Sequence, residues 1–290
     1  MNRVIGRVAV VGLGRMGVPM ALNLSRRGLE LRSWNRSPRA PDILRGLHCQ
    51  TGAPASAVDG ADLVVLALSD AAAIEAVLFD LGAARALSPG AVVADMGTTG
   101  PKAACRHAER LARLGVAYLD APVSGGVAGA EAGALTIMVG GDREVFDRCA
   151  PVLSAMGRPH LMGPVGAGQA AKLANQMIVA GYIAAVAEGV RFAEDLGLSG
   201  GALVDALEGG FADSAILRRH GRKMVTRDFS PGGTCRLHLK DLGLAADLAT
   251  PDVGRFANTA EALRRFERLV AAGQGDADHS AYFQTYEVES

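Results

Sequence analysis

The feature that most constrains the fold is a glycine pattern close to the start of the chain. Arg7–Val11 is a short run rich in β-branched residues, and the apolar residues of Val18–Arg27 follow helical spacing. Between them, Gly12, Gly14 and Gly17 form a G-x-G-x-x-G turn. A strand that passes so directly into a helix predicts the first unit of an α/β domain.

The rest of the first half continues this alternation of strand and helix patterns. Extended stretches are predicted at Leu29–Asn35, Leu63–Leu68, Val92–Asp95 and Val116–Asp120, and helices at Ala71–Leu78, Lys102–Leu114 and Arg143–Leu153. The extended runs are apolar throughout, which is typical of parallel strands buried on both faces. We therefore expect a Rossmann-type, doubly wound parallel sheet with right-handed crossovers.

The second half contains only helical patterns. Gly168–Leu196 has so few interruptions that it predicts one helix of about 30 residues, apolar on most faces and buried in part by another subunit. Shorter helices are predicted at Gly201–Glu208, Ser214–Arg222, Arg236–Leu248, Phe256–Ala271 and Ser280–Val288. With a boundary near Pro164, we expect an α/β domain at 1–164 and an all-helical domain at 165–290, with the long helix joining them and the helical domain forming a homodimer or homotetramer.

The composition argues against several classes of partner. The 290 residues include 30 basic and 30 acidic side chains, so no basic surface for nucleic acid or for an acidic membrane is expected. We expect no leader, and the longest apolar run, Met177–Ala187, is too short to span a bilayer. The four cysteines lack metal or disulfide spacing. We expect them to be buried in a cytoplasmic protein that has neither disulfides nor a metal site.

The glycine turn has the sequence context of a dinucleotide-binding fingerprint. Gly12 permits the tight turn, Gly14 lets the backbone approach a pyrophosphate, and Gly17 lets the helix pack closely on the strand. The pyrophosphate is expected on the N-terminal amides of the following helix. A purely structural glycine turn is the alternative.

The residues after the second predicted strand address the choice of cofactor. NAD-binding domains usually have an acidic residue there for the ribose 2′-hydroxyl, whereas this chain has Asn35, Arg36 and Ser37. A guanidinium can pair with a 2′-phosphate and stack on adenine. The sequence therefore predicts NADP(H), with NAD(H) as the second choice; a solvated arginine is the alternative for Arg36.

Two further stretches could carry chemistry. The segment DAPVSGG at 120–126 places the hydroxyl of Ser124 beside the amides of Gly125 and Gly126, a set that could hold a small carboxylate or form only a turn. In GAGQAAKLANQ at 166–176, a lysine and two amides share one helical face: Lys172, Asn175 and Gln176. That lysine is interpreted as a proton donor or as part of an interdomain hydrogen bond.

These segments together resemble the β-hydroxyacid dehydrogenases, over nearly the whole chain. GLGRMGVPMALNL at 12–24 is similar to the family's cofactor motif, DAPVSGG to its substrate loop and GAGQAAKLANQ to its catalytic helix. HLKDLGLA at 238–245 and GDADHSA at 275–281 also resemble family segments. The resemblance implies reversible hydride transfer between a nicotinamide cofactor and a small 3-hydroxy acid or semialdehyde, at a site between the two domains.

The resemblance also implies roles for individual residues. It places the catalytic lysine at Lys172 and substrate contacts at Ser124, Gly125, Gly126, Asn175, Gln176 and Lys240. It places cofactor contacts at Gly12, Leu13, Gly14, Arg15, Met16, Gly17, Asn35, Arg36, Ser37, Leu68, Ser69, Thr98, Lys240 and Asp241. On the residues alone, Lys240 and Asp241 would be exposed charges. The KLANQ segment favours the branch that reduces tartronate semialdehyde over the branch that oxidises 3-hydroxyisobutyrate.

The chain departs from the family pattern at two places. Ala67–Asp70 replaces the family's Met-Leu-Pro-like strand end, and Gly233 stands where many members have phenylalanine, which suggests a roomier pocket or a looser loop. Two other functions stay open. An imine reductase on the same fold generally lacks a lysine at position 172, and a non-catalytic cofactor-binding protein would have no need to keep it.

Overall fold

The protein is described from a computed structural model that covers residues 4–50, 52–249 and 253–287. The chain divides into two compact units, Met1–Lys172 and Leu173–Ser290. The division falls inside one long helix, directly after Lys172. Each unit has its own hydrophobic core.

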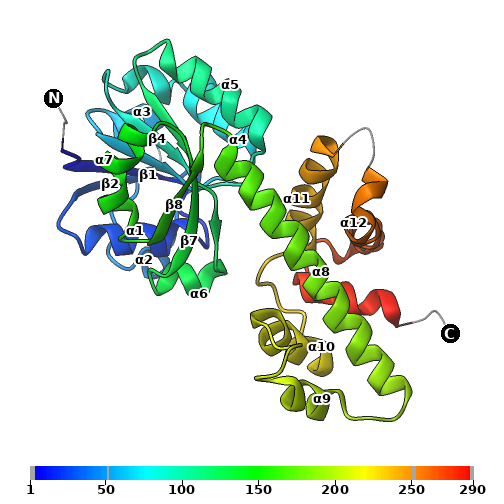
Figure 1. Cartoon of the computed structure of the whole chain (residues 1–290). Helices are drawn as coiled ribbons and strands as arrows, with labels where there is room; N and C mark the ends of the chain where they lie inside the picture. The colour runs from blue at the N-terminus through cyan, green and yellow to red at the C-terminus, as the bar shows by residue number, and fades with distance from the viewer. Residues whose placement is uncertain (1–3, 51, 250–252, 288–290) are drawn as a thin grey trace. The chain divides into compact units, whose positions relative to one another are not determined.

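The N-terminal unit is built on an eight-stranded sheet with helices against it (Figure 1). The strands are β1 (Arg7–Val11), β2 (Glu30–Trp34), β3 (Leu63–Leu66), β4 (Val92–Asp95), β5 (Ala117–Asp120), β6 (Val123–Ser124), β7 (Leu135–Gly140) and β8 (Gly157–Gly163). Their order is β2-β1-β3-β4-β5-β7-β6, with β8 paired to β7.

The predicted parallel sheet is confirmed for the first five strands, which pair in parallel throughout. Beyond β5 the sheet contains strands that the sequence did not predict, and β7 runs antiparallel to both β5 and β6. Parallel pairing resumes between β7 and β8. The domain is therefore a Rossmann-type unit with a mixed sheet.

Strand β1 shows why the central strands are apolar at every position. Val8 and Val10 belong to the core cluster on one side of the sheet, whereas Ala9 and Val11 belong to the cluster on the other side. Side chains alternate between the two faces of a strand, and both faces of this sheet are covered. A continuous apolar run is the expected consequence.

Seven α-helices belong to the N-terminal unit before the long helix, as far as the described residues go. They are α1 (Gly17–Ser25), α2 (Pro41–Leu44), α3 (Pro54–Val58), α4 (Ala71–Glu75), α5 (Pro101–Ala112), α6 (Gly126–Glu131) and α7 (Arg143–Leu153). Helix α4 is shorter than predicted because the backbone continues as a π-helical turn, η1 (Ala76–Asp80).

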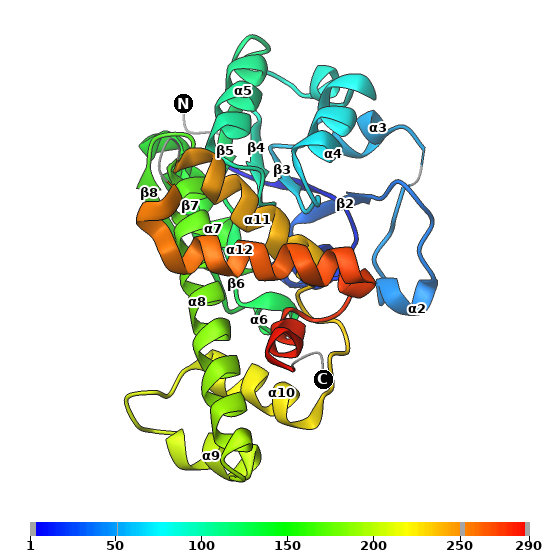
Figure 2. The same ribbon diagram turned by 90° about the vertical axis from the view of Figure 1, so that its right-hand side faces the viewer.

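The long helix is confirmed as α8 (Ala167–Asp195), with 29 residues. The elements that follow are α9 (Gly200–Leu207), η3 (Leu217–Gly221), α10 (Arg222–Thr226), α11 (Cys235–Leu248), η4 (Val253–Phe256), α12 (Ala257–Leu269), η5 (Val270–Gln274) and η6 (His279–Tyr286). The last of these is a 3₁₀ helix rather than the predicted α-helix. Helices α11 and α12 pack against each other (Figure 2).

Helix α8 supplies one wall of the helical core. Ala180, Ile183, Ala187 and Val190 recur at helical spacing and are buried in the core cluster of the second unit. By length and composition, α8 is also long and apolar enough to span a membrane. The shorter run Met177–Ala187 within it, taken alone, did not indicate this. The same properties occur in helices that form the core of a globular protein.

The cysteines differ in part from the expectation. Cys149 and Cys235 are buried, and burial raises the pKa of the Cys149 thiol to about 11 and that of Cys235 to about 12. Cys49 is only half-buried and Cys105 is exposed, so these two are not core residues.

Candidate active site

The three glycines of the G-x-G-x-x-G turn have different surroundings. Gly12 has a φ of +96°, and a Cβ built there would lie 2.5 Å from the carbonyl oxygen of Ala67. A Cβ at Gly17 would lie 1.8 Å from the carbonyl oxygen of Gly12. A Cβ at Gly14 meets nothing within 4 Å. Two glycines therefore serve close packing and the middle one faces open space, as a cradle for a pyrophosphate requires.

Asn35 holds this turn to the loop after β2. Its Oδ1 accepts a hydrogen bond of 2.9 Å from the Leu13 amide, and its Nδ2 donates to the Ser37 carbonyl oxygen at 2.7 Å. The predicted residues of the turn and of this loop therefore lie together. Arg36 is exposed on the same loop.

An open hollow of ≈ 430 Å³ lies beside the glycine turn. Its lining residues are Leu13, Gly14, Arg15, Val18, Pro19, Leu22, Arg39, Asp42, Ile43, Arg45 and Glu131. Sequence reasoning did not single out Arg39, although its position three residues after Arg36 was a usable signal. It adds a second guanidinium to the same loop.

The other predicted cofactor residues follow neighbouring strands. Leu68 and Ser69 follow β3, and Thr98 follows β4, so these residues lie at the carboxyl edge of the sheet with the turn after β1. A Cβ at Gly97 would lie 2.6 Å from the Leu68 carbonyl oxygen, which shows how close the two loops are. The Ser69 hydroxyl donates to Oδ2 of Asp70 at 2.8 Å.

The loop after β4 is bound to the first turn of α8 by a residue that sequence reasoning missed. The Gln169 side chain is fully buried, and its Oε1 accepts hydrogen bonds from the amides of Thr99 at 2.9 Å and Gly100 at 3.0 Å. Its Nε2 donates to the carbonyl oxygen of Gly97 at 2.9 Å. One amide side chain thus pairs three backbone groups of the loop.

The backbone of the same helical turn is bound to β5. Asp120 Oδ1 accepts from the amide of Gly166 at 2.8 Å, and Oδ2 accepts from the amide of Gln169 at 2.7 Å. Burial raises the pKa of the Asp120 carboxyl. A Cβ at Gly168 would lie 2.3 Å from the Met138 carbonyl oxygen, so glycine is needed where the helix rests on β7.

A second buried carboxylate supports the loop from within the sheet. Asp95 Oδ2 accepts hydrogen bonds from the hydroxyls of Thr99 at 3.0 Å and Tyr118 at 2.9 Å, and its Oδ1 accepts from the Gly97 amide at 2.9 Å. Burial raises the pKa of Asp95 to about 6. The loop is therefore fixed from both of its sides.

Lys172 lies one helical turn beyond Gln169, on the same face of α8. Its side chain is 8% exposed.

The predicted substrate loop lies in the same unit, where Ser124 ends β6 and pairs with Thr136 of β7. The next residues, Gly125 and Gly126, have φ values of +130° and +63°, a backbone conformation that favours glycine. Both residues are exposed.

The remaining predicted residues form one network in the helical unit. The Gln176 Nε2 donates to Asp241 Oδ2 at 2.7 Å, and the Asn175 Nδ2 donates to Gln176 Oε1 at 2.9 Å. The Lys240 ammonium lies 3.2 Å from Asp241 Oδ1. Asp241 is 6% exposed, so this pair is not the exposed pair that the residues alone suggested.

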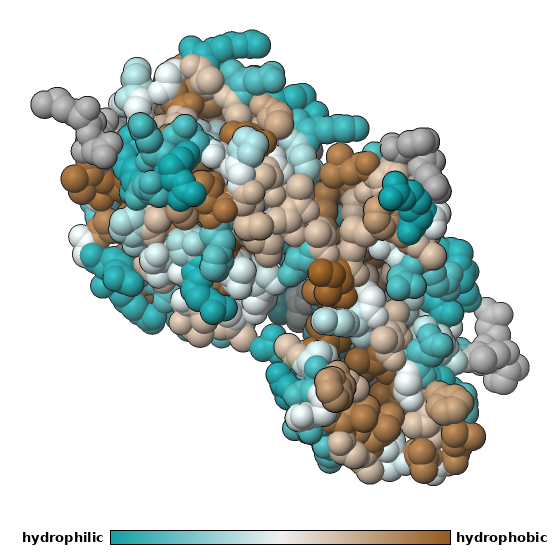
Figure 3. All heavy atoms as spheres, in the orientation of Figure 1, coloured by the Kyte–Doolittle hydropathy of each residue, from teal (hydrophilic) through white to brown (hydrophobic). Residues whose placement is uncertain are grey.

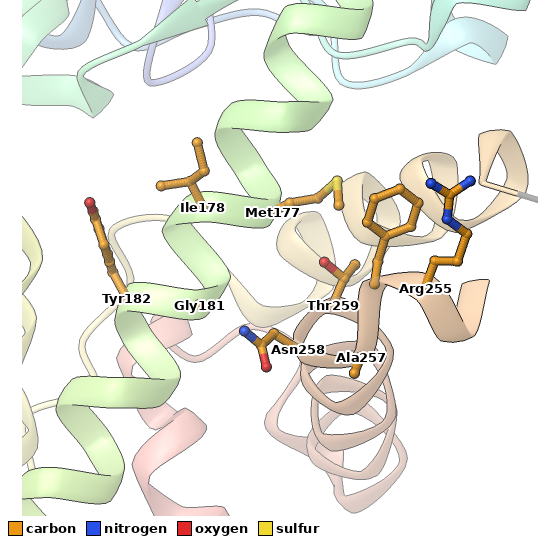
Figure 4. A pocket seen from close by; sticks show the side chains of 9 residues that line it. Met177, Ile178, Gly181, Tyr182, Arg255, Ala257, Asn258 and Thr259 are labelled. Carbon is orange, nitrogen blue, oxygen red and sulfur yellow. The ribbon is translucent and has the colours of Figure 1, made fainter. Parts of the chain in front are cut away.

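The helical unit has a larger hollow, of ≈ 780 Å³, that none of the predicted site residues lines. Its walls are Met177, Ile178, Gly181 and Tyr182 of α8 and residues 255–259, at the end of η4 and the start of α12. Figure 4 shows Ile178 and Tyr182 projecting from one side of α8 and Met177 from the other. As far as the described residues go, its lining contains no lysine, histidine or carboxylate, the side chains that most often transfer protons in enzymes.

Comparison with known proteins decides the family. Residues 7–168 match the family described as the NAD binding domain of 6-phosphogluconate dehydrogenase. Residues 166–286 match the family described as NAD-binding of NADP-dependent 3-hydroxyisobutyrate dehydrogenase. The chain belongs to the β-hydroxyacid dehydrogenase family. It is therefore an NAD(P)-dependent oxidoreductase of the 3-hydroxyacid type.

Two relatives and one solved structure each match more than nine tenths of this β-hydroxyacid dehydrogenase. The chain is 39% identical to a 2-hydroxy-3-oxopropionate reductase of Escherichia coli, over 97% of each chain. It is 34% identical to an NAD-dependent L-serine dehydrogenase of Pseudomonas aeruginosa, over 94% of this chain and 95% of the relative. A solved Mycobacterium tuberculosis 3-hydroxyisobutyrate dehydrogenase with L-serine superposes with a TM-score of 0.84 at 32% identity, covering 98% of this chain and 100% of that chain.

Proposed function

We propose that the protein is an NADP(H)-dependent semialdehyde reductase, reversible as a 3-hydroxyacid dehydrogenase, with 2-hydroxy-3-oxopropionate as its first candidate substrate. The observation that carries the proposal is Lys172, a buried lysine one helical turn beyond the turn that Asp120 binds to β5 and Gln169 binds to the loop after β4. The similarity to the Escherichia coli reductase supports the choice of substrate. Oxidation of 3-hydroxyisobutyrate is the second candidate.

The residues of the chain account for the acid–base part of such a reaction. A bound nicotinamide cofactor supplies the hydride. Lys172 stabilises the growing negative charge on the carbonyl oxygen and donates a proton to it; in the reverse direction its neutral amine accepts the hydroxyl proton. The Ser124 hydroxyl and the amides of Gly125 and Gly126 orient the substrate carboxylate.

An assay of the purified protein tests the substrate class. NADPH oxidation is measured with tartronate, methylmalonate and succinic semialdehydes, with glyoxylate and with a cyclic imine. We expect the highest kcat/KM with tartronate semialdehyde. Turnover of the imine alone would replace the proposal with an imine reductase. NADPH binding without any turnover would leave a cofactor-binding protein.

The choice of NADP(H) predicts a specific effect of Arg36. In Arg36→Ala we expect the KM for NADPH to rise about tenfold or more, because a charge-assisted contact with the 2′-phosphate is lost. The KM for NADH should change little, since NADH has no such phosphate. Arg113→Ala, which removes an exposed arginine elsewhere in the unit, is the control. A wild-type protein that prefers NADH tenfold would contradict the proposal.

We also propose that a second copy of the chain covers part of α8. Ile178, Tyr182 and Phe192 are between 52% and 66% exposed along this helix. Figure 3 shows apolar side chains gathered on the surface of the helical unit. Their exposure favours association through this unit. Light scattering of the full chain should give the mass of a dimer or tetramer.

A further inference from the structure

Three histidines that have no part in the proposed reaction lie in contact in the helical unit. His279 Nε2 is 3.1 Å from His220 Nε2, and His279 Nδ1 is 3.2 Å from His238 Nδ1. The three rings come from separate elements, η3, α11 and η6. They lie close in space although up to 59 positions separate them along the chain.

A buried carboxylate completes the cluster. Asp278 is 1% exposed, and its Oδ1 lies 3.7 Å from His220 Nδ1. One ligand atom from each of His220, Asp278 and His279 lies within 4.8 Å of the other two. Imidazole nitrogen and carboxylate oxygen are the donors that bind Zn²⁺ and related divalent ions in proteins.

The distances suit a shared ion. Two imidazole nitrogens bound to one tetrahedral ion at about 2.0–2.1 Å lie about 3.3 Å apart. The two Nε2 atoms of His220 and His279 are already 3.1 Å apart. His279 Nδ1 would then donate its hydrogen to His238 Nδ1, and a metal-bound histidine usually makes such a bond with its other nitrogen.

The surroundings of the cluster also point to a ligand. His220 is 9% exposed, and its Nδ1 is fully buried with no hydrogen-bond partner among the described residues. An orphaned buried polar atom is costly and calls for an explanation.

The chain around the cluster fits it closely. A Cβ at Gly233 would lie 3.4 Å from Cε1 of the His279 ring, and a Cβ at Gly232 would lie 2.6 Å from Asp278 Oδ2. The Gly232 amide donates to that oxygen at 2.8 Å, and the Lys223 ammonium lies 3.4 Å from it. The two glycines leave room for the cluster. The Lys223 ammonium and a bound ion would both interact with the Asp278 carboxylate.

We propose that His220, His279 and Asp278 form a binding site for one divalent transition-metal ion with the ligand preferences of Zn²⁺. His238 orients the His279 ring through the contact between their Nδ1 atoms. The ion joins η3 to the start of η6 and so stabilises the C-terminal part of the helical unit. The site is independent of the proposed reductase activity, and its test uses none of that activity.

Metal binding is measured directly on the full chain, without a histidine tag and after treatment with a chelator. Zn²⁺ is titrated calorimetrically, and thermal unfolding is followed with and without it. We expect one ion per chain and a rise in the unfolding midpoint of about 5 °C or more at 100-fold excess over Kd. In His220→Gln both effects should disappear. His160→Gln, a change of an exposed histidine in the other unit, should keep both.

A spectroscopic measurement on the unchanged protein covers the case in which His220→Gln does not fold. X-ray absorption of the Zn²⁺-loaded chain should show a nitrogen and oxygen shell at about 2.0–2.1 Å with imidazole scattering. A sulfur shell at about 2.3 Å would assign the ion to a cysteine and overturn the proposal. Lack of stoichiometric binding, or binding that His220→Gln leaves intact, would overturn it as well. The rings would then be joined by hydrogen bonds only.

Discussion

Lys172→Ala is expected to lower kcat for semialdehyde reduction by about 100-fold or more, because a general acid contributes about 10²–10⁴ to the rate. The Kd for NADPH should change by less than about threefold, since the glycine turn and the loop after β2 carry the predicted cofactor contacts. Stopped-flow or steady-state kinetics give kcat, and fluorescence titration gives the Kd.

Two further variants separate proton transfer from charge. Lys172→Arg keeps a positive charge but not a group suited to exchanging its proton, so its kcat should stay low. Lys102→Ala removes an exposed lysine of the same unit and should leave kcat unchanged. If Lys172→Ala keeps more than about a tenth of the wild-type kcat, Lys172 is not the proton donor.

The sequence predicted the elements whose pattern is local and strong. Strands β1, β3 and β4 are apolar at nearly every position, and α8 has a long uninterrupted helical pattern. Strand β8 was missed because Gly157–Gly163 is mostly exposed or half-buried and contains Pro159, as an edge strand does. Strand β7 was missed because nothing in the sequence of β5 or β6 indicates that an antiparallel strand pairs with them.

The candidate site could be predicted only where short motifs carry it. The glycine turn and Lys172 stand out in the sequence because their neighbours form a recognisable pattern. Gln169 and Asp120 also lie in quoted motifs, but their role was not predicted because it depends on hydrogen bonds to partners between 46 and 72 positions away. The histidine cluster was missed for the same reason. The cysteines lack metal-ligand spacing in the sequence, and His220 and His279 come together only through the fold.

Among residues that do not contact the substrate, Gln169 should give the largest effect: Gln169→Leu is expected to lower both stability and rate. This variant leaves two buried amides and one carbonyl oxygen of the loop after β4 without their side-chain partner. Each such loss costs about 1–3 kcal/mol, so the three together should lower the unfolding midpoint of the N-terminal unit by about 10 °C or more. Because the first turn of α8 then loses its attachment to the loop, Lys172 loses its fixed position, and kcat should fall roughly 10- to 100-fold.

A matched variant distinguishes misplacement of Lys172 from general loss of stability. Asn23 is another buried amide, and its Nδ2 donates to the Ala130 carbonyl oxygen at 2.6 Å, between α1 and α6. Asn23→Leu should lower the unfolding midpoint but keep kcat within about twofold at a temperature where both variants are folded, because that contact does not hold α8. Equal losses of kcat in the two variants would show that Gln169 acts only through stability. A loss confined to Gln169→Leu shows that the loop after β4 positions the lysine.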